Sequence, residues 1–249
     1  MRERPGSGHA EELRGMRETL TFTADEALPP ASRLLRDQGL PSLDRLSPRL
    51  HSGLDDAVAL FRSLAKPRAV IEEVDGKAIE GILGALGALD EAPVVARILP
   101  RARAFALYVA TLGEPLSVRV HDLFAGGDLA LAWTLDAVAS SAADRLADLL
   151  SGRFRERIIA RGETDARVLP YCPGYCGWPT SGQAPLFARL HPDDVGVHLT
   201  DGFLMLPIKS VSGILLAGDS RTHAFDAAMD FCATCTTHAC DARMASVTD

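Results

Sequence analysis

Apolar residues recur at helical spacing in two segments of the chain. In GLDDAVALFRSLA (53–65), Leu54, Val58, Phe61 and Ala65 fall on one stripe, which predicts an amphipathic helix. Residues 129–162 are rich in Ala and Leu, follow Gly126-Gly127-Asp128, and carry basic residues before Gly162. These start and stop signals, with cations near the negative end of the helix dipole, predict one long helix.

Other segments read as strands or as shorter helices. Strands are predicted where β-branched and apolar residues cluster between turn signals, and helices where the period returns to about 3.6. The predicted strands are 68–74, 104–113, 195–200, 202–206 and 210–218, and the further helices are 78–98 and 183–190. Strands and helices do not alternate regularly, which favours an α+β fold with helices flanking a mixed sheet.

Length and charge narrow the class of protein. The chain has 249 residues, enough for one well-cored domain, and a formal net charge of −7. We expect a flexible N-terminal arm (1–25), one α+β domain (26–225), and a Cys-rich C-terminal segment (226–249) packed on that domain.

Lysines occur only at positions 66, 77 and 209, so we expect no nucleic-acid role. No apolar run approaches the roughly 20 residues of a membrane span, and no secretory leader is evident, so a cytoplasmic protein is expected.

One short loop concentrates unusual residues. CPGYCGWP (172–179) holds two cysteines, two glycines, two prolines and two aromatic residues, and it cannot be helical. Three interpretations are open: a metal knuckle on Cys172 and Cys176, a backbone cradle for a ligand centred on 173–175, or a plain turn. In the cradle, Gly174 lets the backbone approach a ligand and Tyr175 stacks on a purine or closes the pocket.

The C-terminal cysteines form a second candidate site. Cys232, Cys235 and Cys240 have the spacing C-x2-C-x4-C, and thiolates at such spacing hold zinc or an iron–sulfur cluster. A fourth ligand would come from Cys172, Cys176 or His238. The alternative is free buried thiols, and the spacing does not separate zinc from a cluster.

Four motifs in order resemble a known family. They are ADRLAD (143–148), PGY (173–175), LTDGFLMLP (199–207) and SVSG (210–213), with ATLG (110–113) as a further strand end. In order and spacing they resemble the activation (reactivation) domain of cobalamin-dependent methionine synthase, over roughly residues 100–218. The resemblance implies that domain's α+β fold, with a mainly antiparallel twisted sheet, here as a standalone protein.

The resemblance also implies a function. In the family this domain binds S-adenosylmethionine and supports reductive methylation of cobalamin, with an electron-donor protein as partner. Here the cobalamin would be carried by a separate corrinoid-binding protein or methyltransferase. Asp148 stands where the family has a glutamate near the ligand's positive end. Pro173, Gly174 and Tyr175 correspond to the loop against the ligand, and Ser210 and Ser212 belong to the strand that shapes the cleft floor.

Other interpretations of the same residues stay open. Asp148 on a helix face is ordinarily just solvated, and Lys209 either contacts an anionic group or guards a strand edge. Pro170 stands where the family has an arginine for the ligand's carboxylate, and Ser181 lies near the position of a family histidine. These departures and the five cysteines favour an alternative: a metal- or iron–sulfur-binding redox or corrinoid-interacting protein that no longer binds S-adenosylmethionine. A third hypothesis is a non-catalytic protein that only docks a corrinoid carrier.

Overall fold

A five-stranded antiparallel sheet forms the centre of the computed structural model, which describes residues 17–40, 42–84, 95, 98–175, 177–219 and 221–222. Its strand order is β1 (Arg17–Thr21), β2 (Arg68–Val74), β3 (Ala104–Thr111), β7 (Ser210–Gly218) and β4 (Arg167–Tyr171), and every neighbouring pair is antiparallel. Strands β5 (His198–Leu199) and β6 (Met205–Leu206) form a small second sheet. The predicted α+β class with a mainly antiparallel sheet is confirmed.

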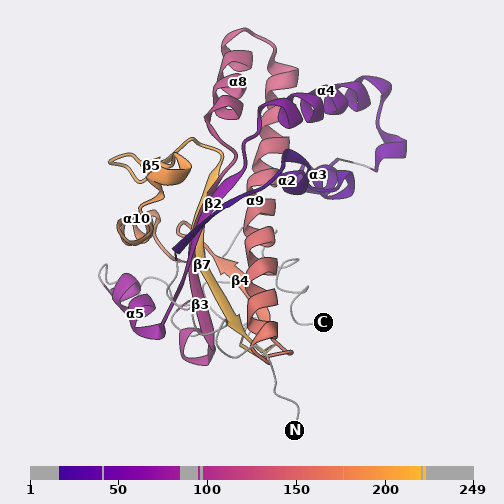
Figure 1. The fold of residues 1–249 in the computed structure, drawn as a ribbon. Coiled ribbons are helices and arrows are strands. Elements are labelled where there is room, and N and C mark those ends of the chain that lie inside the picture. Colours follow the sequence, from indigo (N-terminus) through magenta and orange to yellow (C-terminus); the bar gives the residue numbers. More distant parts are fainter. Residues whose placement is uncertain are drawn as a thin grey trace.

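Helices cover both faces of the large sheet (Figure 1). The described α-helices are α2 (Ala24–Ala27), α3 (Ala31–Asp37), α4 (Pro48–Leu64), α5 (Gly76–Gly84), α8 (Glu114–Ala125), α9 (Leu129–Ala160) and α10 (Gln183–Leu190). Short 3-10 turns are η1 (Leu43–Arg45), η2 (Leu99–Arg101), η3 (Thr180–Gly182) and η4 (Pro192–Val195). The 32-residue helix α9 runs along one face, where α4 and α8 pack against it, and α10 contacts the other face.

The alternation of side chains along each strand creates two separate apolar cores. On β2, Ala69 and Ile71 join the core beneath α9, whereas Val70 joins the core beneath α10. On β7, Leu215 faces α9 and Leu216 faces α10. Because successive strand residues point to opposite faces, one sheet supplies apolar groups to both helical layers.

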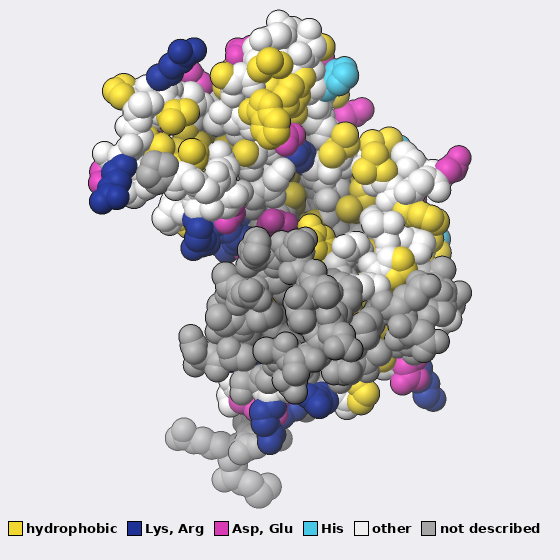
Figure 2. Space-filling model, turned by 180° about the vertical axis from the view of Figure 1, so that it is seen from behind, with side chains coloured by type: hydrophobic (Ala, Val, Ile, Leu, Met, Phe, Trp, Pro, Cys, Tyr) yellow, Lys and Arg dark blue, Asp and Glu magenta, His cyan; other side chains and the backbone are white. Residues whose placement is uncertain are grey.

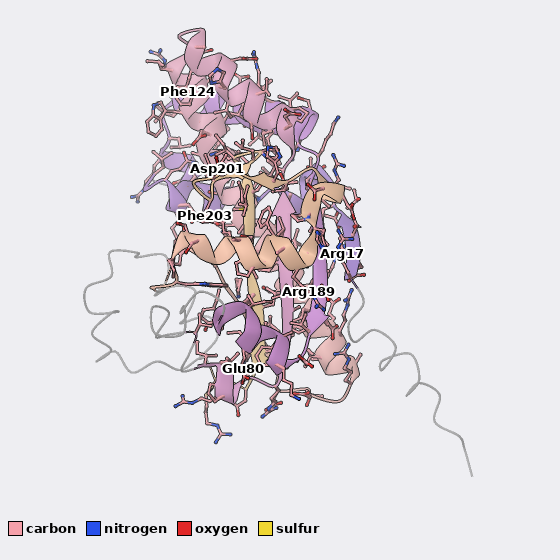
Figure 3. All side chains as sticks on the ribbon, turned by 90° about the vertical axis from the view of Figure 1, so that its left-hand side faces the viewer. Arg17, Glu80, Phe124, Arg189, Asp201 and Phe203 are labelled. Atoms are coloured by element: carbon pink, nitrogen blue, oxygen red, sulfur yellow. The ribbon has the colours of Figure 1, made fainter. Side chains whose placement is uncertain are left out.

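Two buried carboxylates on β2 tie these layers to the sheet. Glu72 and Glu73 are each 5% exposed. Arg161, the residue that caps the C-terminus of α9, donates two hydrogen bonds to Glu73, at 2.7 and 3.0 Å, and Arg189 of α10 donates to Glu72 from Nε at 3.0 Å. Figure 3 shows Arg189 on the α10 side of the molecule. A buried carboxylate is tolerated when it is paired and hydrogen-bonded, so these two acids hold the helices in place.

The pattern of apolar residues located the main elements closely. The structure places β2 over 68–74, α10 over 183–190 and β7 over 210–218, as predicted, and α9 ends two residues before the predicted end. The amphipathic helix predicted at 53–65 is α4, which starts earlier because Ser47 caps it and Pro48 occupies its first position. The predicted helix 78–98 corresponds to α5 up to Gly84, and most of the rest lies outside the described residues.

Several elements differ from the prediction. The expected arm 1–25 is too long, because Arg17–Thr21 form edge strand β1; a sequence with one apolar residue, RETLT, gives little strand signal. Strand β4 was not predicted because Pro170 interrupts it, although an edge strand tolerates proline. Helix α8 was not predicted either. The C-terminal segment 226–249 lies outside the described residues.

The end of the molecule formed by α8 and the start of α9 carries exposed apolar side chains (Figure 2). Phe124 is 37% exposed and Trp133 is 69% exposed, and their rings meet edge to face with centroids 6.3 Å apart. In the part of the chain that the structure describes, no helix is long and apolar enough to cross a membrane.

Candidate functional site

The PGY loop is anchored on both faces of the sheet. It leaves β4 at Cys172, which packs on the core beneath α9 and whose Sγ lies 3.2 Å from the Tyr108 hydroxyl. Six residues later, Trp178 is 1% exposed and belongs to the core beneath α10. The loop therefore crosses the β4 edge of the sheet, with one end fixed in each core.

Backbone hydrogen bonds close the loop into a tight turn. The amide of Gly174 donates to the carbonyl of Trp178 at 2.6 Å, and the amide of Trp178 donates to the carbonyl of Tyr175 at 2.9 Å. Gly174 has φ +91°, a backbone angle that favours glycine. Tyr175, at the tip, is 54% exposed. A rigid backbone thus presents an aromatic ring toward solvent, and such a ring can stack on a flat ligand.

The residues that open β7 are fully engaged inside the protein. Lys209 Nζ lies 2.7 Å from an Asp136 carboxylate oxygen and 2.9 Å from Ser140 Oγ, and its side chain is 11% exposed. Ser210 Oγ donates to the Pro207 carbonyl at 2.6 Å and lies 2.9 Å from Thr111 Oγ1. These contacts bind β7 to α9 and to β3. Lys209 does not guard a sheet edge, because β7 is an inner strand.

Ser212 and Gly213 lie deeper in the same strand. Ser212 is 2% exposed, and its hydroxyl has no hydrogen-bond partner among the described residues. A Cβ at Gly213 would collide with the Tyr171 carbonyl and reach within 3.1 Å of the Tyr108 hydroxyl. The glycine of SVSG therefore permits the close approach of β4 that positions the PGY loop.

Asp148 occupies a half-exposed position on α9 and is already paired. Its carboxylate accepts a hydrogen bond from Arg33 of α3, in an ion pair whose side chains are 28% and 34% exposed. Burial opposes the charge of Arg33, but the hydrogen bond to Asp148 and the charges of Asp148, Asp37 and Asp144 outweigh it and raise the Arg33 pKa. A positively charged ligand at Asp148 would have to share this carboxylate with Arg33.

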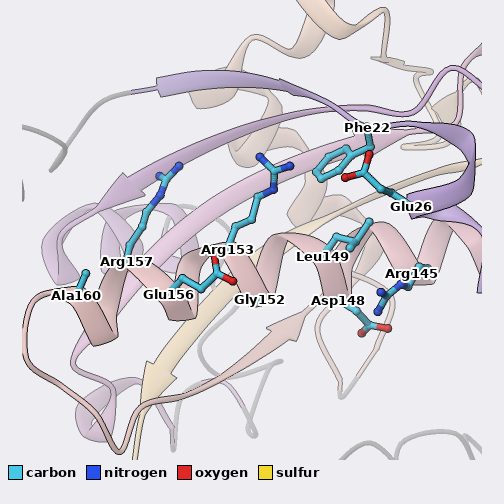
Figure 4. Close-up of a pocket in the computed structure, with 10 residues that line it drawn as sticks. All are labelled: Phe22, Glu26, Arg145, Asp148, Leu149, Gly152, Arg153, Glu156, Arg157 and Ala160. Atoms are coloured by element: carbon cyan, nitrogen blue, oxygen red, sulfur yellow. The ribbon is translucent and has the colours of Figure 1, made fainter.

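An open groove runs along α9 beside Asp148 (Figure 4). The segment Phe22–Glu26 forms its opposite wall, and its volume is about 740 Å³. Its α9 lining is Arg145, Asp148, Leu149, Gly152, Arg153, Glu156, Arg157 and Ala160. The ADRLAD motif contributes Arg145 and Asp148. Sequence reasoning missed the groove, although Gly152 and Glu156 continue the Asp148 face at the helical spacing i+4.

The cysteine site stays a prediction. Cys172 is the one candidate ligand that the structure describes, and it is partly buried against Tyr108. Cys176, Cys232, Cys235 and Cys240 lie outside the described residues. Within the described ranges, no group of three or more His, Cys, Asp or Glu side chains is arranged to hold a metal ion.

Comparison with known proteins identifies a likeness in structure. No model of a protein family matches the sequence, and no curated protein matches it. The structure is similar to a crystal structure of the MetH reactivation domain bound to AdoHcy, with a TM-score of 0.58 and 15% sequence identity. The likeness covers 82% of this chain and 78% of that one. At this identity it shows the fold, and it confirms the fold that the resemblance implied.

Proposed function

We propose that this protein is a corrinoid-reactivation factor that binds S-adenosylmethionine and supports reductive methylation of a cobalamin carried by a partner protein. One observation carries the proposal: the chain shares its fold with a reactivation domain whose structure holds AdoHcy, the product form of that methyl donor. The four motifs of the resemblance lie within the same fold, in α9, in the loop at the β4 edge, across the paired strands β5 and β6, and at the start of β7.

In this proposal the reacting groups of the methyl transfer would be those of the bound cofactors and not protein side chains. The sulfonium supplies the methyl group, a donor protein supplies one electron, and the corrinoid cobalt accepts the methyl group. The protein's own share is binding and orientation. Tyr175 offers an exposed ring on a backbone fixed by the hydrogen bonds of Gly174 and Trp178. Asp148 offers a carboxylate for the positive sulfonium or ammonium, shared with Arg33.

In this proposal the strand motif has a supporting role. Lys209 and Ser210 are bonded within the fold, and Gly213 admits β4 beside β7. They would hold the cleft floor rather than contact the ligand through free polar groups. Ser212 is the exception, since its buried hydroxyl has no partner among the described residues.

Calorimetric titration with S-adenosylhomocysteine tests the ligand. We expect wild-type protein to bind it, and Tyr175→Ala to bind about tenfold more weakly, because stacking of one ring contributes about 1 kcal/mol or more. Trp133→Ala is the matched control, since Trp133 is also an exposed aromatic residue but lies on α9 near α8. Wild-type protein that binds neither S-adenosylhomocysteine nor S-adenosylmethionine would overturn the proposal.

A second measurement tests the reaction itself. Free cobalamin under chemical reduction is mixed with S-adenosylmethionine, and methylcobalamin formation is followed by visible absorbance with and without the protein. We expect the protein to accelerate methylation and Tyr175→Ala to remove most of the acceleration. Ligand binding without any acceleration would keep the binding role and exclude transfer to this acceptor.

A further inference from the structure

Helices α8 and α9 form an antiparallel pair that ends in a continuous run of exposed residues. Every residue from 124 to 130 is exposed, over the end of α8, the connecting turn and the start of α9. Nine large apolar side chains are exposed among the described residues, and four of these lie on α8 and α9: Val118, Phe124, Leu129 and Trp133. Single exposed apolar side chains are ordinary, whereas a group gathered at one end of a helix pair indicates an interaction surface.

We call this surface, formed by Val118, Phe124, Leu129 and Trp133, the hairpin tip. The rings of Phe124 and Trp133 meet edge to face across the two helices, with centroids 6.3 Å apart. Val118 lies two turns before the exposed Ala125, so the two share one face of α8. Figure 2 shows hydrophobic side chains gathered at this end of the molecule.

The charges around the hairpin tip are bonded inside the protein or are of both signs. The carboxylate of Asp136, on the next turn of α9, lies 2.7 Å from Lys209 Nζ. Asp128 accepts a hydrogen bond from a backbone amide in the first turn of α9. On the outer side of α8, Arg119 and Asp122 are exposed and opposite in charge. Two tips can therefore approach each other without strong like-charge repulsion, although the chain has a net charge of −7.

The hairpin tip lies at the end of the sheet where β3 ends and β7 begins. The longer stretches outside the described residues, 1–16, 85–94 and 223–249, join the chain toward the opposite end. Arg17 begins β1 beside Glu72, α5 follows the end of β2, and Thr222 follows the end of β7. Strand β7 has nine residues and so spans about 30 Å. A second molecule is therefore the nearest candidate to cover the tip.

We propose that the hairpin tip is the interface of a homodimer, in which two copies of this chain pack their α8–α9 helix pairs together about a twofold axis. Two antiparallel helix pairs stacked in this way form a four-helix arrangement. A twofold contact lets each tip cover the other, so no second complementary surface is needed. This interface goes beyond the proposed function, because none of the motifs that suggest a ligand contributes to the tip.

The exposed area of the tip is close to what such a dimer needs. A standard interface buries about 800 Å² on each partner and a homodimer interface is about 65% apolar, which requires about 500 Å² of apolar surface. A fully exposed side chain of this size offers roughly 150–250 Å². The four tip side chains are 37% to 69% exposed, so together they present about 400 Å². The exposed Ala125 and Ala130 add to this area.

Analytical ultracentrifugation of the full chain over a range of concentrations tests the dimer. We expect wild-type protein to reach twice the mass of one chain, and Leu129→Glu to raise the dissociation constant about thirtyfold or more, because a carboxylate would be buried without a partner. The variant should fold, since Glu in the first turn of a helix suits the helix dipole.

Leu43→Glu is the matched control. Leu43 is an exposed leucine on η1, which packs on α3 and not on the hairpin tip. The same substitution there should leave the dissociation constant unchanged. Wild-type protein that stays monomeric up to millimolar concentration, or an equal loss of dimer in Leu43→Glu, would overturn the proposal.

Tryptophan fluorescence shows whether a dimer uses this surface. The sequence has two tryptophans, of which Trp178 is 1% and Trp133 is 69% exposed, so quenching by acrylamide reports on Trp133. We expect Trp133 to be quenched in dilute protein and protected as the dimer forms. A dimer in which Trp133 stays quenchable would refute the proposal. Protection of Trp133 in the monomer would show that another part of the same chain covers the tip, which also contradicts it.

Titration with S-adenosylhomocysteine separates the dimer from the corrinoid-reactivation role. Leu129→Glu should lose the dimer and keep the ligand, whereas Tyr175→Ala should keep the dimer and weaken ligand binding. A dimer that binds no S-adenosylhomocysteine would refute only the reactivation role. A monomer that binds it would refute only the interface.

Discussion

The PGY loop and the SVSG strand both belong to the motifs that resemble the reactivation domain. They differ in whether their side chains are bonded inside the protein or exposed to solvent. In the strand, Lys209 is bonded to Asp136 and Ser140, and Ser210 to Pro207 and Thr111. The loop is fixed at both ends, yet its tip presents Tyr175 to solvent. The motifs of the resemblance therefore contain two kinds of residue: those whose side chains are bonded inside the fold and those whose side chains are exposed to solvent.

This contrast predicts opposite responses to mutation. Strand residues should matter for stability because their polar and steric requirements are met inside the protein. Loop-tip residues should matter for ligand binding and hardly for stability, because an exposed side chain loses little on truncation. The following variants test the contrast in order of decreasing effect on stability.

Among the variants at Gly213, Lys209 and Tyr175, Gly213→Ala should have the largest effect on stability. The added Cβ would collide with the Tyr171 carbonyl, so β4 or β7 must shift. Overpacking of this kind costs about 3 kcal/mol, measured as a lower midpoint of chemical denaturation. Gly53→Ala is the control, because a Cβ at Gly53, in α4, would meet nothing within 4 Å. Equal stability of Gly213→Ala and wild type would show that β4 and β7 can move apart at this point without a loss of stability.

Lys209→Met should have an intermediate effect. The substitution keeps the aliphatic stem and removes the ammonium that lies 2.7 Å from Asp136. A hydrogen-bonded charge pair of this sort contributes about 2 kcal/mol, and a double-mutant cycle with Asp136→Ala isolates the pair. Additive losses in the cycle would mean that Lys209 acts through packing alone.

Tyr175→Ala should have the smallest effect on stability, within about 0.5 kcal/mol of wild type. The side chain is 54% exposed, and the turn is held by backbone hydrogen bonds that the substitution leaves in place. Thermal denaturation measures this, with Trp178→Ala as a buried aromatic comparison that should cost about 4 kcal/mol. A large destabilisation by Tyr175→Ala would place Tyr175 with the strand residues rather than with the ligand-facing ones.

Long periodic segments were predictable from sequence, whereas elements defined by their neighbours were not. Helix α9 and strands β2 and β7 carry strong patterns of apolar residues, and their bounds differ little from the prediction. Strand β1 has one apolar residue in five, and β4 contains Pro170, so neither has a local signal. Both are edge strands, and pairing with an inner strand is what makes them strands.

The candidate site shows the same division. The loop, Asp148 and the SVSG strand were found as short motifs whose order resembles that of a known family. The partners of these residues were not predictable, because Arg33 is 115 residues from Asp148, and Ser140 is 69 residues from Lys209. Their positions depend on how α3 and β7 pack against α9.

By itself, the sequence determined the class of fold, the main helices and strands, and the motifs that suggest a ligand. Local propensity and apolar periodicity are properties of neighbouring residues, so they can be read along the chain. Only the tertiary structure decided that Lys209 pairs with Asp136, that Asp148 pairs with Arg33, and that the buried Nε of Arg145 makes no hydrogen bond among the described residues. Whether a charge is satisfied depends on groups distant in sequence, and packing alone brings those groups together.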